Sequence, residues 1–403
     1  MTPRPPLLSV DDALDQIIKA VSTMPSERIA VEAALGHVLA ADIKANLSHP
    51  PADVSAMDGY AVHSSHLSST PKSLTVIGES AAGHPFNGVL GADQAVRIFT
   101  GAYVPQGADA IVLQEDTNRD GDVVMILEQP KPEQFIRKAG QDFSHGDLIA
   151  SKGATLDARR LALIASSGHG TVPTHCKPVV AIISTGDELV RPGSTPKDGQ
   201  IVSSNDLFLT HLITSLGATA MNLGQMADQD DALTKAFDQA KSADLIVTSG
   251  GASVGNHDGV ARHMNESGGL AFWRIAMRPG KPLIFGQIDQ TPMLGLPGNP
   301  VSTGVCAMIF VAAAIRKMLG QDPLPNHSHA KLIAPLGEND RRQDYLRARI
   351  HIDDQGQTWA EAFNKQDSGM LKTFSDADGL IIRPPHAPPA EAGDPVPVLL
   401  LPR

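Results

Sequence analysis

The alternation of short apolar runs with amphipathic segments between Pro178 and Leu319 is the feature that most constrains the fold of this chain. The runs Val179–Ser184 and Leu245–Val247 are typical of buried strands, whereas Asp206–Leu216 and Asp231–Ala243 carry apolar residues at helical spacing. Strands that alternate with helices predict a mainly parallel sheet with helices on both faces. In such a sheet, ligands bind beyond the carboxyl ends of the strands.

Polar loops follow these predicted strands and are therefore expected to share one edge of the sheet. They hold Glu188 after the first strand, Asp228 after the second, Ser249, Gly250, Gly251 and Ser253 after the third, and Gly295–Asn299 after another. Glycines allow a ligand to approach the backbone closely, and serine hydroxyls add donors. This edge is predicted to bind an anion, although a tight turn without a ligand explains the third loop alone about equally well.

Charged side chains near the same edge refine this prediction. Arg278 and Lys281 lie in M-R-P-G-K-P, with Arg274 four residues before Arg278, and Asp258 is expected to cap a further helix. Cations suit a phosphate group, and carboxylates suit Mg²⁺, so we expect an activated phosphate ligand and metal-assisted bond breaking. Salt bridges among these acids and bases are the alternative.

The flanking segments predict three further units. Helical patterns follow a Ser9 cap and cover Ala30–Ala41 and Thr155–Ser167, whereas short β-like runs lie between them and after Leu319. A long helix, Pro300–Leu319, is expected to be capped by Asn299. The predicted domains are a split helical domain (1–43 plus 145–177), an inserted β-rich domain (44–144), an α/β domain (178–324) and a small C-terminal β-domain (325–403).

Composition excludes some classes of partner. The 33 Lys and Arg against 44 Asp and Glu give a formal net charge of −11, which does not favour binding to nucleic acid or an anionic membrane. The longest apolar run, Val305–Ile315, is shorter than the roughly 20 residues that span a bilayer. With no secretory pattern at the N-terminus and two widely separated cysteines, a cytoplasmic protein is expected.

Six motifs occur in order along the whole chain. They read S-A-M-D-G-Y, T-G-A-x-x-P-x-G-A-D-A, S-T-G-D-E-L, T-S-G-G-x-S-V-G, P-G-K-P and G-L-P-G-N-P-V-S. Together they resemble the molybdopterin molybdenumtransferase family, which inserts molybdenum into molybdopterin and is related to the C-terminal part of gephyrin. The resemblance implies a homodimer of elongated subunits, each with a split helical domain, an inserted β-rich domain, a three-layer α/β domain that binds the pterin, and a C-terminal β-barrel.

The resemblance also implies an activity. Molybdenum would pass from molybdate to adenylylated molybdopterin with release of AMP, in a reaction that depends on Mg²⁺. An upstream molybdopterin adenylyltransferase is a possible partner. Two alternatives stay open, namely a dimeric scaffold that binds the pterin without turnover and a related enzyme that adenylylates molybdopterin.

Roles for individual residues follow from the resemblance alone. The catalytic and metal-binding acids would be Glu188, Asp228 and Asp258, with Asp58, Thr100 and Asp142 reaching the same cleft from the other subunit. The substrate would contact Ser249, Gly250, Gly251, Ser253, Arg274 and Arg278, and molybdate would contact Lys281, Ser302, Arg347 and Ser368. Arg274 and Arg278 stand where family members often have lysine.

Overall fold

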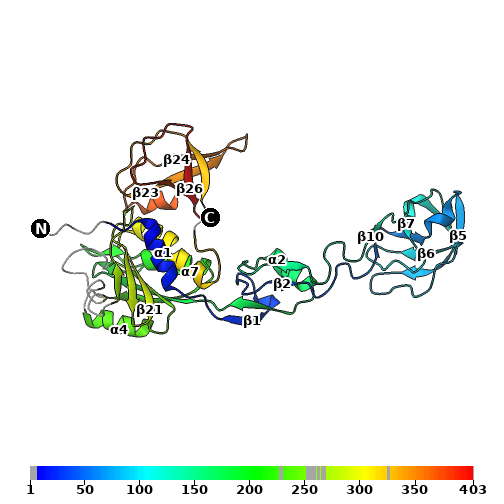
Figure 1. Ribbon diagram of the computed structural model, residues 1–403, viewed down its shortest axis with the longest axis horizontal. Helices are drawn as coiled ribbons and strands as arrows, with labels where there is room; N and C mark the ends of the chain where they lie inside the picture. Colours follow the sequence, from blue (N-terminus) through cyan, green and yellow to red (C-terminus); the bar gives the residue numbers. More distant parts are fainter. Residues whose placement is uncertain are drawn as a thin grey trace.

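The chain folds into an elongated molecule with its largest unit at one end and a β-rich module at the other (Figure 1). The computed structural model describes residues 7–226, 230–250, 260, 264, 269–324 and 327–402. A small unit built around α2 lies between the two ends, and the C-terminal barrel sits beside the largest unit.

A six-stranded sheet in the order β16-β13-β17-β21-β20-β18 forms the centre of the α/β unit. Its strands are β13 (Val179–Thr185), β16 (Thr219–Met226), β17 (Leu245–Ser249), β18 (Leu270–Phe272), β20 (Ile284–Ile288) and β21 (Thr291–Leu296). The first three and β21 are parallel, and β20 and β18 are antiparallel additions. The predicted mainly parallel sheet is therefore confirmed.

Helices cover both faces of this sheet because successive strand residues point to opposite sides. On β13, Val180 and Ile182 join the core that contains α3 (Asn205–Ser215), whereas Ala181 and Ile183 join the core that contains α4 (Asp230–Ala240). The predicted three-layer arrangement follows directly from this alternation.

One long helical segment, Pro300–Met318, fills the first of these cores. It comprises α6 (Pro300–Cys306), a π-helical turn (Ala307–Val311) and α7 (Ala312–Met318). Its length and mean hydropathy of 1.5 would allow it to cross a membrane, but 83% of it is buried inside the protein. It is therefore a core helix of the α/β unit.

The first helix, α1 (Val10–Ala20), begins as predicted. Ser9 Oγ accepts the Asp12 N–H at 3.0 Å and donates to Asp12 Oδ2 at 2.7 Å, which caps the helix. Its apolar face, including Ile17, packs into the same core as α7. The helix thus belongs with the α/β unit, although the sequence analysis grouped it with residues 145–177.

The predicted helix Ala30–Ala41 is wrong. Instead, β1 (Ser26–Ala30) pairs with β12 (Thr171–His175), and a single 3₁₀ turn (Val31–Ala33) follows. Gly36 has a φ of +76°, a left-handed conformation that ends a right-handed helix. Apolar residues do recur at helical spacing in this stretch, but its backbone pairs instead with residues near Thr155 and Thr174.

The rest of this central unit agrees better with the prediction. Helix α2 (Ala158–Ser166) lies within the predicted span, with the Asp157 side chain accepting the Arg160 N–H at its start. A short strand pair, β2 (Ile43–Lys44) with β11 (Leu148–Ala150), leads out to the inserted module.

The inserted module is a six-stranded sheet in the order β7-β4-β6-β5-β9-β8. Its strands are β4 (Gly59–Val62), β5 (Lys72–Ser80), β6 (Gln94–Ile98), β7 (Ala110–Leu113), β8 (Thr117–Asp120) and β9 (Val123–Ile126), with β3 (Val54–Ser55) and β10 (Ile136–Arg137) paired beside it. The short β-like runs of the sequence analysis are confirmed as strands.

The C-terminal unit is a closed five-stranded barrel. Its strands are β22 (Ser328–Leu332), β23 (Gln343–Ile352), β24 (Thr358–Ala362), β25 (Gly379–Arg383) and β26 (Pro395–Leu400). They follow the order β23-β24-β22-β26-β25, and β25 pairs back onto β23. The sequence analysis missed β24 and the short helix α8 (Leu371–Ser375).

A short strand of the α/β unit attaches to this barrel. Strand β19 (Met277–Arg278) pairs with Gln343 and Asp344 of β23. The apolar stretch Ala271–Met277 is thus not a single strand, because its two ends belong to different sheets as parts of β18 and β19. The four domain boundaries stay a prediction.

The packing of α1 on α7 gives a stability test. Replacing the fully buried Ile17 by Ala should lower the free energy of unfolding of the α/β unit by about 2–5 kcal/mol, because it leaves a cavity between the helices. The neighbouring Gln16→Ala, on the exposed side of α1, should change it by less than about 0.5 kcal/mol. Urea unfolding followed by circular dichroism measures both, and equal small effects would contradict this packing.

Candidate functional site

The carboxyl ends of the parallel strands meet at one edge of the sheet. In the strand register, Thr185 pairs with Met226, Ser184 with Ser249, and Ser249 with Leu296. The loops after all four strands therefore start at the same level. The predicted shared edge of polar loops is confirmed for the residues that the structure describes.

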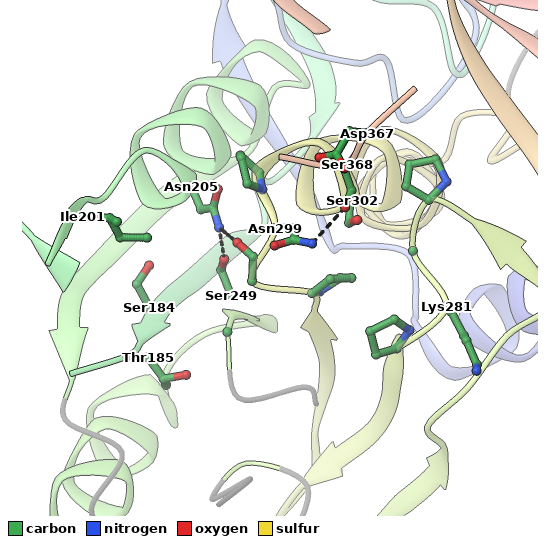
Figure 2. A pocket seen from close by; sticks show the side chains of 18 of the residues that line it. Ser184, Thr185, Ile201, Asn205, Ser249, Lys281, Asn299, Ser302, Asp367 and Ser368 are labelled. Atoms are coloured by element: carbon green, nitrogen blue, oxygen red, sulfur yellow. Dashed lines mark hydrogen bonds between the residues drawn. The ribbon is translucent and has the colours of Figure 1, made fainter. Parts of the chain in front are cut away.

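A cleft of about 710 Å³ opens between this edge and the barrel (Figure 2). Of the predicted site residues, it is lined by Glu188, Ser249, Gly250, Arg278, Lys281, Ser302 and Ser368. Ser368 comes from the barrel and Ser302 from α6, and the other five come from the sheet edge and its loops. The volume of the cleft suits a small-molecule ligand.

Two glycines shape the sheet side of the cleft. Gly250 has a φ of +91°, and a Cβ there would lie 2.3 Å from the Thr185 carbonyl oxygen. Gly186 has a φ of +147°, and a Cβ would lie 2.6 Å from Glu188 Oε2. Only glycine fits at either position, so the Glu188 carboxylate can fold back beside the end of β13.

Asn205 joins two loops of this edge and was missed by the sequence analysis. Its Nδ2 donates to Ser249 Oγ and to the Gly298 carbonyl, both at 2.8 Å (Figure 2). In the sequence, the only signal is an Asn at the start of a helix, which usually indicates a cap. The two hydrogen bonds instead fix the loops after β17 and β21 relative to each other.

The barrel contributes Arg342 and the loop of residues 366–368 to the opposite wall. Asn299 Nδ2 donates to Ser368 Oγ at 2.8 Å, and the Val301 N–H donates to the Ser368 carbonyl at 3.2 Å. Asn299 stands at the N-cap position of α6, but its side chain makes no capping hydrogen bond. The predicted cap is therefore corrected, since this side chain contacts the barrel.

Arg347 lies behind this loop. Its side chain is buried, with 1% exposure for the residue, and its Nη2 donates to the Asp367 carbonyl at 3.2 Å. Burial lowers the pKa of its guanidinium, and Nε has no hydrogen-bond partner within the described chain. The structure thus places Arg347 beneath the loop of residues 366–368, outside the set of residues that line the cleft.

Arg278 is held by the barrel. Its Nε donates to Asp344 Oδ1 at 2.7 Å, Nη2 bonds to Asp344 Oδ2, and Nη1 lies 3.3 Å from Asp340 Oδ2. The hydrogen bond to Asp344 raises the pKa of Arg278, and the hydrogen bond from Arg342 lowers the pKa of Asp340 to about 2. Arg278 therefore forms salt bridges with acidic residues of the protein, which was the alternative to phosphate binding. It also lines the cleft.

The two other predicted cations differ from each other. Arg274 lies over the Trp273 ring, 4.2 Å from its centroid, and is not among the residues that line the cleft. Lys281 lines the cleft and is exposed, and no carboxylate of the described residues lies within ion-pair distance of it. Lys281 is therefore available to an anionic ligand.

Three predicted residues lie in or next to the inserted module, far from this cleft (Figure 1). The Thr100 N–H and hydroxyl both donate to Asp58 Oδ1, at 2.8 and 2.9 Å, and lower the pKa of Asp58. Asp142 lines a separate cavity of about 530 Å³ with His49 and Arg137. One subunit therefore does not bring these residues to the cleft.

Four predicted site residues, Asp228, Gly251, Ser253 and Asp258, lie outside the described residues. Of the three predicted metal-binding acids, only Glu188 is described. Within the described ranges, no three His, Cys, Asp or Glu side chains form a group that could hold a metal ion.

The fold and the cleft define a class of protein. It is a multidomain α/β protein with a cleft of small-molecule size between the edge of a mainly parallel sheet and a β-barrel. Three family descriptions match consecutive parts of the chain, namely MoeA N-terminal region (domain I and II) over residues 8–168, probable molybdopterin binding domain over 181–317, and MoeA C-terminal region (domain IV) over 329–401.

Relatives of similar length confirm this match. A molybdopterin molybdenumtransferase from Haemophilus influenzae is 35% identical, over 97% of this chain and 98% of its own. A second from a Nostoc species is 34% identical, over 100% of this chain and 97% of its own. This chain therefore belongs to the molybdopterin molybdenumtransferase family.

Solved structures agree with the fold. A molybdopterin biosynthesis MoeA protein from Pyrococcus horikoshii superposes with a TM-score of 0.83 and 31% identity, covering 98% of this chain and 99% of its own. A molybdenum cofactor biosynthesis protein from Pyrococcus furiosus, 19% identical with a TM-score of 0.60, supports the fold alone. The predicted four-part architecture is thus confirmed.

The glycine at the end of β17 gives a second test. Gly250→Ala should lower the free energy of unfolding by about 1–3 kcal/mol, because Gly250 has a positive φ and the new Cβ would clash with the Thr185 carbonyl oxygen. The shift that relieves this clash should also close part of the cleft. Gly337→Ala is the matched control, since a Cβ there meets nothing within 4 Å. Thermal unfolding compares the two, and two indistinguishable melting temperatures would argue against this geometry.

Proposed function

We propose that this protein transfers molybdenum from molybdate to adenylylated molybdopterin and releases AMP. The family of its full-length relatives supports the transfer of molybdenum to a molybdopterin. The observation that carries the full proposal is the division of one cleft into two polar halves. Ser249, Gly250 and Glu188 line the half at the sheet edge, and Ser302 and Ser368 line the half next to the barrel, with Lys281 on the cleft wall apart from the two serines (Figure 2).

The sheet-side half suits the pterin and its phosphates. Ser249 Oγ accepts a hydrogen bond from Asn205, so its own hydrogen is free to donate to a phosphate oxygen. Gly250 has no side chain and lets that oxygen approach the backbone. Glu188 stands at the edge of this half as an exposed carboxylate.

The barrel-side half suits molybdate, a tetrahedral dianion. The Lys281 ammonium supplies charge, and the hydroxyls of Ser302 and Ser368 supply donors. Arg347 acts from behind, because it fixes the loop through the Asp367 carbonyl and places a buried positive charge near the dianion. Placed together, these groups hold the oxyanion beside the pterin bound in the other half, so that the two substrates react in one orientation.

Magnesium fits this cleft and is part of the proposal. The Glu188 carboxylate and the buried hydroxyls of Ser184 and Thr185, which have no hydrogen-bond partner within the described residues, offer the hard oxygen atoms that Mg²⁺ prefers. Asp228 and Asp258 are the further acids that the sequence suggests. When bound, the ion would neutralise charge on the phosphoanhydride whose cleavage releases AMP.

A second subunit is also part of the proposal. The two hydrogen bonds from Thr100 lower the pKa of Asp58 and fix the orientation of its carboxylate, which suits a group that binds a cation or orients water. Because the inserted module projects away from its own cleft (Figure 1), we infer a homodimer in which this module completes the partner's cleft. A cytoplasmic location and supply of the substrate by a molybdopterin adenylyltransferase belong to the same proposal.

Product analysis tests this function. With adenylylated molybdopterin, molybdate and Mg²⁺, the protein should release AMP, and release should cease when the divalent cation is removed. Glu188→Gln should slow release by at least about 100-fold with an unchanged circular dichroism spectrum, because Glu188 is exposed at the cleft and supports no core.

The alternatives predict other products. Binding of the pterin with no AMP above a reaction without enzyme would contradict the proposal and favour the non-catalytic scaffold. Consumption of ATP with unmodified molybdopterin would favour the adenylylating enzyme.

A further inference from the structure

Asn299 has a side chain whose contacts differ from those that its position suggests. It stands at the N-cap of α6, where an Asn side chain ordinarily accepts an N–H of its own helix. Here it makes no such bond, and its Nδ2 instead donates to Ser368 Oγ at 2.8 Å (Figure 2). The side chain therefore connects the α/β unit to the barrel, across 69 residues of sequence.

The backbone carbonyl of Ser368 provides a hydrogen-bond acceptor for an N–H group in the first turn of α6. The Val301 N–H donates to the Ser368 carbonyl at 3.2 Å, which is a bond that a cap side chain would otherwise make. Ser368 thus receives two hydrogen bonds from the first residues of α6, one on its carbonyl and one on its hydroxyl oxygen.

The barrel braces this loop from the other side. Arg347 Nη2 donates to the Asp367 carbonyl at 3.2 Å, and Gly369 N–H donates to Asp367 Oδ1 at 2.7 Å. These contacts fix the backbone of the loop but leave the Ser368 hydroxyl free to rotate. Among the described residues, Asn299 is the one hydrogen-bond partner of the Ser368 hydroxyl oxygen.

The direction of the Asn299 bond decides what Ser368 can do. Because Nδ2 is the donor, it occupies a lone pair of Ser368 Oγ and leaves the hydroxyl hydrogen for another acceptor. Ser302, one helical turn after Asn299, lines the same cleft, and its side chain lies beside that of Ser368 (Figure 2). The hydroxyls of Ser302 and Ser368 can then donate to one oxyanion.

We propose that Asn299 is a positioning residue for the molybdate half of the cleft, which orients the Ser368 hydroxyl as a donor. This inference rests on the proposed function. Asparagine suits the task because it is a neutral donor of the right length. An aspartate would accept the Ser368 hydrogen instead and would repel a dianion, and a serine would be too short to reach.

Asn205 provides a matched control within the same cleft. It uses the same Nδ2 chemistry at the same 2.8 Å distance, but its partners are Ser249 on the pterin side and the Gly298 carbonyl. If each asparagine orients the serine that it contacts, loss of each should affect a different substrate.

The test measures AMP release against molybdate and against adenylylated molybdopterin for Asn299→Ser and Asn205→Ser. Asn299→Ser should raise the half-saturating molybdate concentration about tenfold and change that of the pterin by less than about twofold, the effect of losing one hydrogen bond. Asn205→Ser should raise the half-saturating concentration of the pterin more than that of molybdate, because Asn205 contacts Ser249 as well as Gly298. Serine is itself a good N-cap, so a role limited to helix stability predicts no change at position 299.

Two further variants make the result independent of folding defects. Asn299→Asp keeps the cap preference and should raise the half-saturating molybdate concentration by more than Asn299→Ser, because its carboxylate reverses the bond and repels the dianion. Combining Asn299→Ser with Ser368→Ala should raise it no further than Ser368→Ala alone, since both remove one interaction.

The outcomes separate this inference from the proposed function. An active wild type with unchanged molybdate dependence in Asn299→Ser, or with both substrates affected equally, would overturn the role of Asn299 and leave the proposed function standing. A wild type that releases no AMP at any molybdate concentration would overturn the proposed function itself.

Discussion

The junction between β19 and β23 is the contact on which the cleft depends. The α/β unit and the barrel meet there, and the Arg278–Asp344 ion pair joins two residues that are partners in the strand pairing. Asp344 is buried, so its charge is compensated by a guanidinium that supplies two hydrogen bonds. Loss of either partner would leave a charge in a partly buried contact and would free the barrel to move from the sheet edge.

Close packing near the start of the core helix supports the same junction. A Cβ at Gly304 would lie 2.4 Å from the Phe374 ring, so the missing side chain lets α8 of the barrel rest directly on α6. This approach brings the loop of Ser368 to the beginning of α6. Without it, Ser302 and Ser368 would not line the same cleft.

Local patterns predicted the sheet and the edge where the site lies. Apolar runs followed by Gly250 or by Glu188 specify both a strand and the loop after it, so their position was readable from the sequence. The strand Ser26–Ala30 could not be predicted from the sequence, because its pairing partner β12 follows the whole inserted module. The left-handed conformation of Gly36 could not be predicted either, because nothing distinctive surrounds it in the sequence.

Contacts between the α/β unit and the barrel could not be predicted from the sequence either. Asn299 reads as a helix cap and Arg278 as a phosphate-binding cation, yet each contacts a barrel residue, 69 and 66 positions away respectively. Such pairs depend on how two domains meet, which periodicity and motif spacing do not encode. The four motif residues outside the described chain, among them Asp228 and Asp258, stay predictions.

We propose that one active site needs two subunits, because Glu188 lines the cleft whereas Asp58 lies in the inserted module at the other end of the molecule. The most direct measurement mixes Glu188→Gln protein with Asp58→Asn protein, dissociates and reassociates the subunits, and follows AMP release. Each variant alone should be inactive, whereas random reassociation should restore roughly a quarter of wild-type activity, because half of the dimers carry one intact site of two. No activity above that of the separate variants would contradict the account.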